Sequence, residues 1–322
     1  MNKSIKLIFN YLLAPALFLL LTVSLYRQIS SQPDLSERWL HIRESWHNLS
    51  FWIVFLMMFL NWGIEARKWQ LLISPLEKIS FSTSFKSVFA GCSVSMLTPN
   101  RIAEYGGRIL FVQPYNRIRA ISVTILGSLS QLLVTLFIGS CGLVYLNYFS
   151  TSAAIVPWIN SDVLVLVSIS VTVILSMLFF QIQWVVNFMQ KFAFLKNLMK
   201  HLTILDYFRG KQLLRILLFS FIRYIIFILQ YVLLLNVLEV NVSIHISLSL
   251  LTIFYLVMAL APTIGFIELP VRAAASVELF KLYSENIVGI QAAAFGIWII
   301  NLVLPAIIGS ILIFGIKILK ER

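Results

Sequence analysis

The chain has 322 residues, of which 60% are hydrophobic and 12% are charged, and its formal net charge is +12. Soluble domains carry roughly one quarter charged residues, so this composition excludes a soluble globular protein. Apolar stretches close to the roughly 20 residues that cross a bilayer recur from end to end, which predicts an all-α integral membrane protein.

Six membrane-crossing helices are predicted in chain order, at residues 7–26, 50–73, 119–147, 155–183, 212–238 and 287–317. The first has a longer apolar run than a signal peptide and no small-residue cleavage site, so we interpret it as a retained helix. The stretch 183–210 mixes aromatic residues with lysines and is expected to be an interfacial linker.

Two further apolar segments, residues 81–113 and 243–283, are interrupted by Pro, Gly and charged residues. Broken backbone at membrane depth is tolerated only where protein or a wet cavity surrounds it. Each segment therefore predicts a re-entrant hairpin, in which a helix, a break and a second helix enter and leave on the same side. A pair of full crossings is the alternative.

Basic residues are distributed unevenly along this layout. With the N-terminus inside, most of the 25 Lys and Arg residues fall in inner segments. Those expected at the inner interface include Arg67, Lys68, Arg117 and Arg119. The positive-inside rule then predicts a multi-pass protein of the plasma (inner) membrane with both termini in the cytoplasm. This placement explains the basic net charge, so nucleic acid is not expected as a partner.

This orientation makes the two halves of the chain opposite in topology. The unit 50–147 begins outside, whereas the unit 212–322 begins inside, which predicts an inverted-topology repeat. Residues 1–48 add an N-terminal helix and an outer loop, and residues 155–211 add a connecting helix and the inner linker; together, residues 1–322 are expected to form a single polytopic domain. Such repeats, with broken helices near the midplane, are typical of secondary transporters.

The first interrupted segment contains TPNRIAEYGGR, in which Arg101, Glu104 and Arg108 have the spacing i, i+3 and i+7 and share one helix face. A Glu between two Arg residues leaves one net positive charge, which attracts a phosphate or another anion. Gly106 and Gly107 would allow a head group or a neighbouring helix to approach the backbone.

The second interrupted segment contains PTIGFIELPVR, in which Glu268 and Arg272 are spaced for a helical ion pair. Ionisable residues at membrane depth cost about 3 kcal/mol or more and usually mark a pathway. We therefore predict that a substrate-binding site is formed by Arg101, Glu104, Arg108, Arg223, Glu268 and Arg272. The alternative is that these charges only pair with one another and hold the broken helices together.

Other chemistries find little support in the sequence. The four His residues are scattered, without an HExxH motif, and Cys92 and Cys141 lie in apolar surroundings. Neither a GxxxxGK[ST] loop nor a GxSxG elbow occurs. We therefore expect no metal site, no cofactor and no catalytic residue, and the chain is not expected to be an enzyme.

At its two breaks the sequence resembles the flippase-like membrane domain family, which forms the transmembrane part of lysylphosphatidylglycerol synthases. TPNRIAEYGGR is similar to the family pattern TPGRxGExxR. The residues that match are Thr98, Pro99, Arg101 and Glu104. Asn100 and Ala103 replace glycines of the pattern, and Arg108 lies one position later than the final Arg of the pattern. APTIGFIELPVRAA resembles the family turn PTPGGxGxxE at Pro262, Thr263 and Gly265, whereas Ile264 stands where Pro is usual and Glu268 fits only approximately.

The resemblance implies a lipid-handling role, in which modified phospholipids or lipid-linked molecules with an anionic head group move between leaflets. The soluble aminoacyl-transfer domain of a full synthase is not in this sequence, so aminoacyl transfer is not implied. Two alternatives remain open: an integral-membrane transferase acting on a lipid head group, with Glu104 or Glu268 as general base, and a non-catalytic membrane partner of such an enzyme. The sequence does not predict the lipid, the energy source or the oligomeric state.

Overall fold

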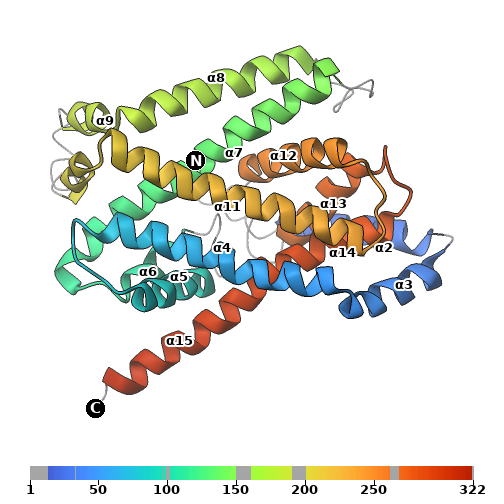
Figure 1. Ribbon diagram of the computed structural model, residues 1–322, viewed down its shortest axis with the longest axis horizontal. Coiled ribbons are helices and arrows are strands. Elements are labelled where there is room, and N and C mark those ends of the chain that lie inside the picture. Colours follow the sequence, from blue (N-terminus) through green and yellow to red (C-terminus); the bar gives the residue numbers. More distant parts are fainter. Residues whose placement is uncertain are drawn as a thin grey trace.

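In a computed structural model the chain folds into helices of very different lengths, arranged as a bundle (Figure 1). The structure describes residues 14–32, 34–96, 98, 102–149, 161–190, 201–261 and 268–320, and these ranges contain no β-strand. The helical elements are α2 (Ala14–Ser30), α3 (Leu35–Glu44), η2 (Ser45–His47), α4 (Leu49–Ile73), α5 (Phe81–Ser95), α6 (Glu104–Ile109), η3 (Pro114–Asn116), α7 (Arg117–Phe149), α8 (Ser161–Phe180), α9 (Ile182–Met189), η5 (Thr203–Tyr207), α11 (Gly210–Val237), α12 (Ile244–Leu260), α13 (Glu268–Phe280), α14 (Ile287–Trp298), η7 (Ile299–Val303) and α15 (Leu304–Lys320).

Within the described ranges, 5 stretches of helix are long and apolar enough to span a bilayer. Each coincides with a predicted crossing: Leu49–Ile73, Pro114–Tyr148, Ser161–Phe180, Gly210–Val237 and Ile287–Ile313. The remaining prediction, residues 7–26, overlaps α2, and residues 1–13 lie outside the described ranges. The chain is therefore an all-α integral membrane protein, as its composition predicted.

Polar side chains fix where several helices begin. Asn48 accepts a hydrogen bond from the Ser50 N–H at 2.9 Å at the start of α4. Ser80 does the same for the Thr83 N–H at the start of α5. The first N–H groups of a helix have no partner within it, so these side-chain acceptors determine the starting points.

Both interrupted segments have the predicted sequence of helix, break and helix. In the first, α5 ends at Ser95 and the short α6 begins at Glu104. In the second, α12 ends at Leu260 and α13 begins at Glu268. Residues 97, 99–101 and 262–267 lie outside the described ranges. These include the motif residues Pro99, Asn100, Arg101, Pro262, Thr263, Ile264 and Gly265.

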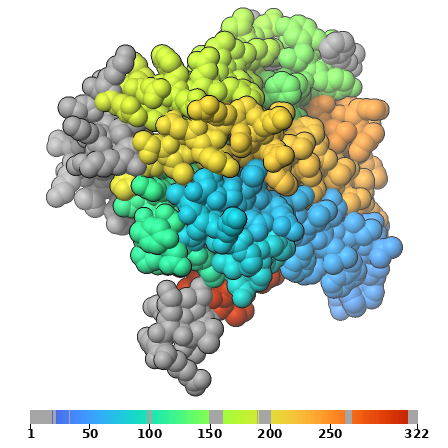
Figure 2. Space-filling model, turned by 60° about the vertical axis from the view of Figure 1, so that its left-hand side comes forward, coloured from blue at the N-terminus to red at the C-terminus, as the bar shows by residue number. Residues whose placement is uncertain are grey.

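The helices of the two predicted halves pack in matching pairs. Helix α4 packs against α11, and the two helices lie side by side in both views (Figures 1 and 2). These two helices are antiparallel, because Gln230 of α11 donates to the Val54 carbonyl near one end and Arg223 contacts Asn61 near the middle. On either side, α5 packs on α15 and α12 packs on α7. The first helix of each interrupted segment thus lies against the last long helix of the other half.

Glycines allow the close approach in both of these outer pairs. A Cβ on Gly309 of α15 would lie 1.9 Å from the Phe89 carbonyl oxygen of α5. A Cβ on Gly142 of α7 would lie 1.9 Å from the Thr252 hydroxyl oxygen of α12. Lipid gives membrane helices no hydrophobic driving force to associate, so they depend on van der Waals contact. Small residues such as these glycines let the helices approach closely enough to make that contact.

Hydrogen bonds between connecting segments show which described loops lie at the same end of the bundle. At one end Gln32, after α2, donates to the Glu285 carbonyl, before α14. At the other end Asn116, before α7, donates to the Glu77 carboxylate, after α4. Each contact joins connections that the sequence analysis assigned to the same side of the membrane.

The last crossing is not a regular α-helix. A π-helical turn, Ile299–Val303, separates α14 from α15. Pro305 follows it and has no N–H to donate to the carbonyl four residues earlier, that of Asn301. Such turns re-aim nearby side chains and are frequent at functional sites.

Three details differ from the sequence predictions. The predicted crossing 155–183 ends earlier, because α8 stops at Phe180 and the separate α9 begins at Ile182. The side chain of Gln183 donates to the Asp206 carbonyl and so draws this stretch toward the linker that follows. The outer loop after α2 contains the helix α3. Finally, Lys68, predicted at the inner interface, is buried and only 2% exposed, because it pairs with a carboxylate inside the bundle.

Candidate functional site

A cavity with a volume of about 500 Å³ lies among the crossing helices. Its lining includes Trp62 of α4, Gln131 of α7, Arg223 of α11 and Asn301 of the π-helical turn. Each of these residues is close to the midpoint of its membrane-spanning stretch. The cavity therefore lies near the mid-depth of the bundle.

The ends of both interrupted segments reach this cavity. Thr98 contributes from the first break, while Ala261, Glu268 and Arg272 contribute from the two sides of the second break. Broken backbone at membrane depth is thus placed beside a cavity within the protein, which is where such backbone is tolerated.

Glu268 and Arg272 form the ion pair that their spacing predicted. Two guanidinium nitrogens of Arg272, Nη2 and Nε, lie 2.6 and 2.7 Å from the Glu268 Oε1. The guanidinium carbon also lies 5.9 Å from the centre of the Phe254 ring. These contacts hold the Arg272 side chain against the cavity wall while leaving it 16% exposed.

Arg223, which also lines the cavity, is held in a similar way. Its Nη1 lies 2.8 Å from the Glu65 Oε2, and its Nε donates to the Asn61 Oδ1 at 2.7 Å. Its guanidinium carbon lies 5.0 Å from the Trp62 ring centre. Asn61 in turn donates to the Asn301 side chain at 3.5 Å, so contacts from both halves of the chain orient Arg223.

Glu65 is the centre of a buried charge cluster behind Arg223. Besides Arg223, it pairs with Lys68 at 2.9 Å and with Arg108 at 2.8 Å, and Arg108 also pairs with Glu104. Among the described residues the three cations exceed the two carboxylates, so the formal net charge of the cluster is +1. In a low-dielectric interior this charge favours an anion in the adjoining cavity.

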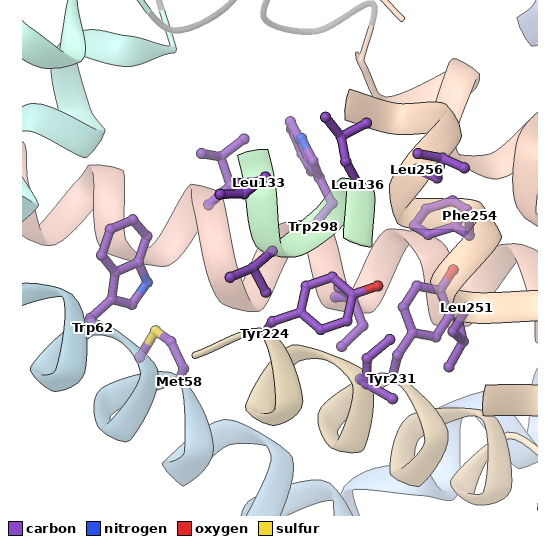
Figure 3. Packing of buried hydrophobic residues seen from close by; sticks show 14 of the residues in the cluster. Met58, Trp62, Leu133, Leu136, Tyr224, Tyr231, Leu251, Phe254, Leu256 and Trp298 are labelled. Atoms are coloured by element: carbon purple, nitrogen blue, oxygen red, sulfur yellow. The ribbon is translucent and has the colours of Figure 1, made fainter. Parts of the chain in front are cut away.

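Several polar atoms beside the cavity have no hydrogen-bond partner among the residues that the structure describes. Figure 3 shows Trp62, Tyr224 and Trp298 projecting from α4, α11 and α14 into the interior. The unpartnered atoms of cavity-lining residues are the indole nitrogens of Trp62 and Trp298, the hydroxyls of Tyr224 and Tyr255, and the amide oxygen of Gln131. Most of these atoms are donors, which suits a ligand rich in acceptor oxygens.

The six predicted site residues divide into three groups. Arg223, Glu268 and Arg272 line the cavity. Glu104 and Arg108 lie in the Glu65 cluster behind it, and Arg101 lies outside the described residues. The alternative interpretation, mutual pairing of the charges, also describes real contacts, because the predicted Glu residues do pair with Arg residues four positions later.

Sequence reasoning missed the central role of Glu65 and Lys68. Both residues were visible as polar groups on the second crossing helix, three positions apart and so on one helix face. Their partners Arg108 and Arg223 are distant in the sequence, and no local spacing indicates such contacts. The aromatic donors of the cavity also carry no local signal, since Trp and Tyr are common in membrane helices.

The two interrupted segments repeat one charged arrangement. In each, the second helix begins with a Glu and carries an Arg four residues later, as Glu104 with Arg108 in α6 and Glu268 with Arg272 in α13. Both pairs form ion pairs. In this structure Arg272 faces the cavity, whereas Arg108 is 4% exposed and bound to Glu65.

Together, the fold and the site define a polytopic helical membrane protein with interrupted helices around a central polar cavity. A family model described as the lysylphosphatidylglycerol synthase transmembrane region matches residues 8–309, and the chain belongs to this family. Membership relates it to membrane proteins of lipid modification or translocation. Comparisons with curated proteins and with solved structures give no match.

Proposed function

We propose that this protein moves an anionic phospholipid or a lipid-linked molecule between the two leaflets of the membrane. The head group passes through the central cavity while the acyl chains remain in lipid. The observation that carries the proposal is the position of Arg223 of α11 and Arg272 of α13, which both line one mid-depth cavity. Secondary transporters bind their substrates at this depth, between interrupted helices.

The head-group chemistry follows from the cavity lining. Arg223 and Arg272 supply charged donors that suit phosphate oxygens. The unpartnered tyrosine hydroxyls and indole N–H groups suit the remaining oxygens of a glycerol or sugar head group. Glu65 and Glu268 hold the two guanidinium groups in place, and a phosphate competes with these carboxylates for them.

An inverted repeat gives this site two equivalent states. The support is the matched packing of α5 on α15 and α12 on α7, together with the Glu–Arg pair that opens both α6 and α13. In the proposed exchange, the first segment, with Arg101, Glu104 and Arg108, takes the place at the cavity that the second segment occupies here. Movement follows a lipid gradient or an ion potential.

The proposed placement is the plasma (inner) membrane, with both termini in the cytoplasm. Its support is the distribution of basic residues, which concentrates on connections at one end of the bundle. The charged inner leaflet would then face that end.

The experiment compares purified variants in liposomes that contain a head-group-labelled anionic phospholipid. Glu268→Gln with Arg272→Gln removes both members of the cavity ion pair, so neither member is left without the other. The matched control, Glu278→Gln with Lys281→Gln, removes an exposed ion pair at the end of the same helix. Because one charge-assisted contact to phosphate is worth about 1.5–3 kcal/mol, we expect the cavity variant to move lipid at least about tenfold more slowly than the wild type. The control is expected to match the wild type.

Mass spectrometry of the lipid after the assay separates translocation from catalysis. An unchanged lipid mass with a changed leaflet distribution supports translocation. A mass shift of the lipid supports the head-group transferase instead. Equal transport by the cavity variant and the wild type would contradict the role given to Arg272.

A further inference from the structure

A second basic groove lies apart from the central cavity, between one end of α4 and the beginning of α11. Its volume is about 420 Å³, and it shares no lining residue with the central cavity. Arg67 and Gln70 line it from α4, and Arg215 lines it from α11. Leu71, Leu218 and Phe219 form its apolar walls.

Arg67 is pre-oriented at this groove by neutral groups. Its Nη1 donates to the Gln70 Oε1 at 2.9 Å, and the Gln70 Nε2 donates to the Ile79 carbonyl at 2.8 Å. The guanidinium carbon lies 4.4 Å from the centre of the Phe81 ring. None of these partners is an anion, so the positive charge of Arg67 remains uncompensated.

Arg215 lies near the start of α11 without an anionic partner. It makes no ion pair with the described part of the chain, and the first turn of α11 contains no acidic residue. Two exposed guanidinium groups therefore border one groove with no carboxylate to neutralise them.

The groove occurs at only one end of the α4–α11 pair. Residues 49–60 of α4 and 224–237 of α11, which form the opposite end, contain no charged residue. The groove end also adjoins the connections in which the chain concentrates its basic residues. Anionic lipids attract basic side chains at the cytoplasmic surface, and long Arg side chains reach the interface from apolar surroundings.

We propose that this groove is a binding site for an anionic phospholipid of the inner leaflet. The phosphate lies between Arg67 and Arg215, and an acyl chain lies along Leu71, Leu218 and Phe219. The occupant is a lipid rather than a free phosphate, because the walls below the two guanidinium groups are apolar. This site does not depend on translocation through the central cavity.

The test measures lipid binding by native mass spectrometry of the delipidated protein, titrated with phosphatidylglycerol or phosphatidylcholine. The wild type is expected to bind phosphatidylglycerol more tightly than phosphatidylcholine. Arg67→Gln with Arg215→Gln is expected to weaken phosphatidylglycerol binding about 30-fold, the effect of two basic side chains at a membrane surface, and to remove the preference.

Lys211→Gln is the matched control, because Lys211 is exposed on the same helix one turn before Arg215 and does not line the groove. We expect it to change binding by less than about threefold. Unchanged binding in the double variant, or equal weakening in the control, would overturn the site. Transport is not read out here, so a failure of this site is distinct from a failure of the proposed translocation.

Discussion

At the scale of single residues, Glu65 is the carboxylate that joins three cations inside the bundle. It is 3% exposed and has three cations within 2.9 Å. A buried carboxylate of this kind is stable only while its partners compensate the cost of leaving water. The same contacts place Arg223 at the cavity, so stability and function meet at this side chain.

Replacing Glu65 by Gln should therefore destabilise the protein strongly. The change leaves Lys68, Arg108 and Arg223 without their shared carboxylate, and breaking a buried ion pair costs about 3–5 kcal/mol. Thermal unfolding in detergent is the measurement, with Glu278→Gln, at an exposed ion pair, as the control that should change little. Adding Lys68→Met restores the net charge of the cluster and should recover part of the loss. Equal unfolding temperatures for Glu65→Gln and the control would refute this account of the cluster.

The site was predictable at the residue scale only where partners are close in the sequence. The spacing of Glu268 and Arg272 gave their ion pair, because a helix brings residues four apart into contact. It could not give the pairing of Arg108 with Glu65, since that contact depends on how α5 packs against both α4 and α6. For the same reason, Lys68 was assigned to the interface instead of to the interior.

At the scale of elements, the crossing of α5 and α6 depends on two glycines. Gly91 and Gly107 face each other, and a Cβ on Gly107 would lie 2.4 Å from the Ala90 carbonyl oxygen and 2.7 Å from the Gly91 Cα. From the sequence, a head group or a neighbouring helix was expected to approach the backbone at both Gly106 and Gly107. The close contact occurs at Gly107, whereas Gly106 has open space where its Cβ would be.

Gly107→Ala should accordingly separate α5 from α6 and disturb the position of Arg108, which follows directly. Overpacking of this kind costs about 1–3 kcal/mol, so the unfolding temperature should fall. Gly106→Ala is the matched control on the same helix and should have no destabilising effect, since alanine favours a helix over glycine. Similar unfolding temperatures for the two variants would show that α5 and α6 are not in close contact.

The crossing helices were predictable because their signal is local. An apolar run of sufficient length predicts a crossing whatever surrounds it, and the observed bounds of α4 and α11 differ from the predicted ones by one or two residues. The π-helical turn Ile299–Val303 and the break at Gln181 escaped prediction. Both depend on how the chain satisfies backbone and side-chain hydrogen bonds with neighbours distant in the sequence.

At the scale of the whole molecule, two halves share one polar interior. α4 from the first half and α11 from the second pack together, and their polar residues Asn61, Glu65 and Arg223 bond to one another across that contact. Helix α8, in contrast, exposes apolar side chains such as Leu166 along much of its length, as a lipid-facing helix does. Polar groups gather inside and apolar groups outside, the arrangement that a membrane imposes on a helical bundle with ionisable residues.

Photochemical cross-linking tests most directly whether a lipid head group enters the cavity. The photoreactive residue p-benzoylphenylalanine replaces Trp298, which is buried beside the cavity and of similar size. The same residue at Leu166, which is 67% exposed on α8, provides a position that should cross-link to lipid regardless of the cavity. The protein is irradiated in nanodiscs that contain an anionic phospholipid, and adducts are identified by mass spectrometry. We predict a phospholipid adduct at residue 298 that disappears when Arg223 and Arg272 are both replaced by Gln, with the adduct at residue 166 retained. No adduct at residue 298, or an adduct of equal yield in the Arg-deficient variant, would contradict head-group binding in the cavity.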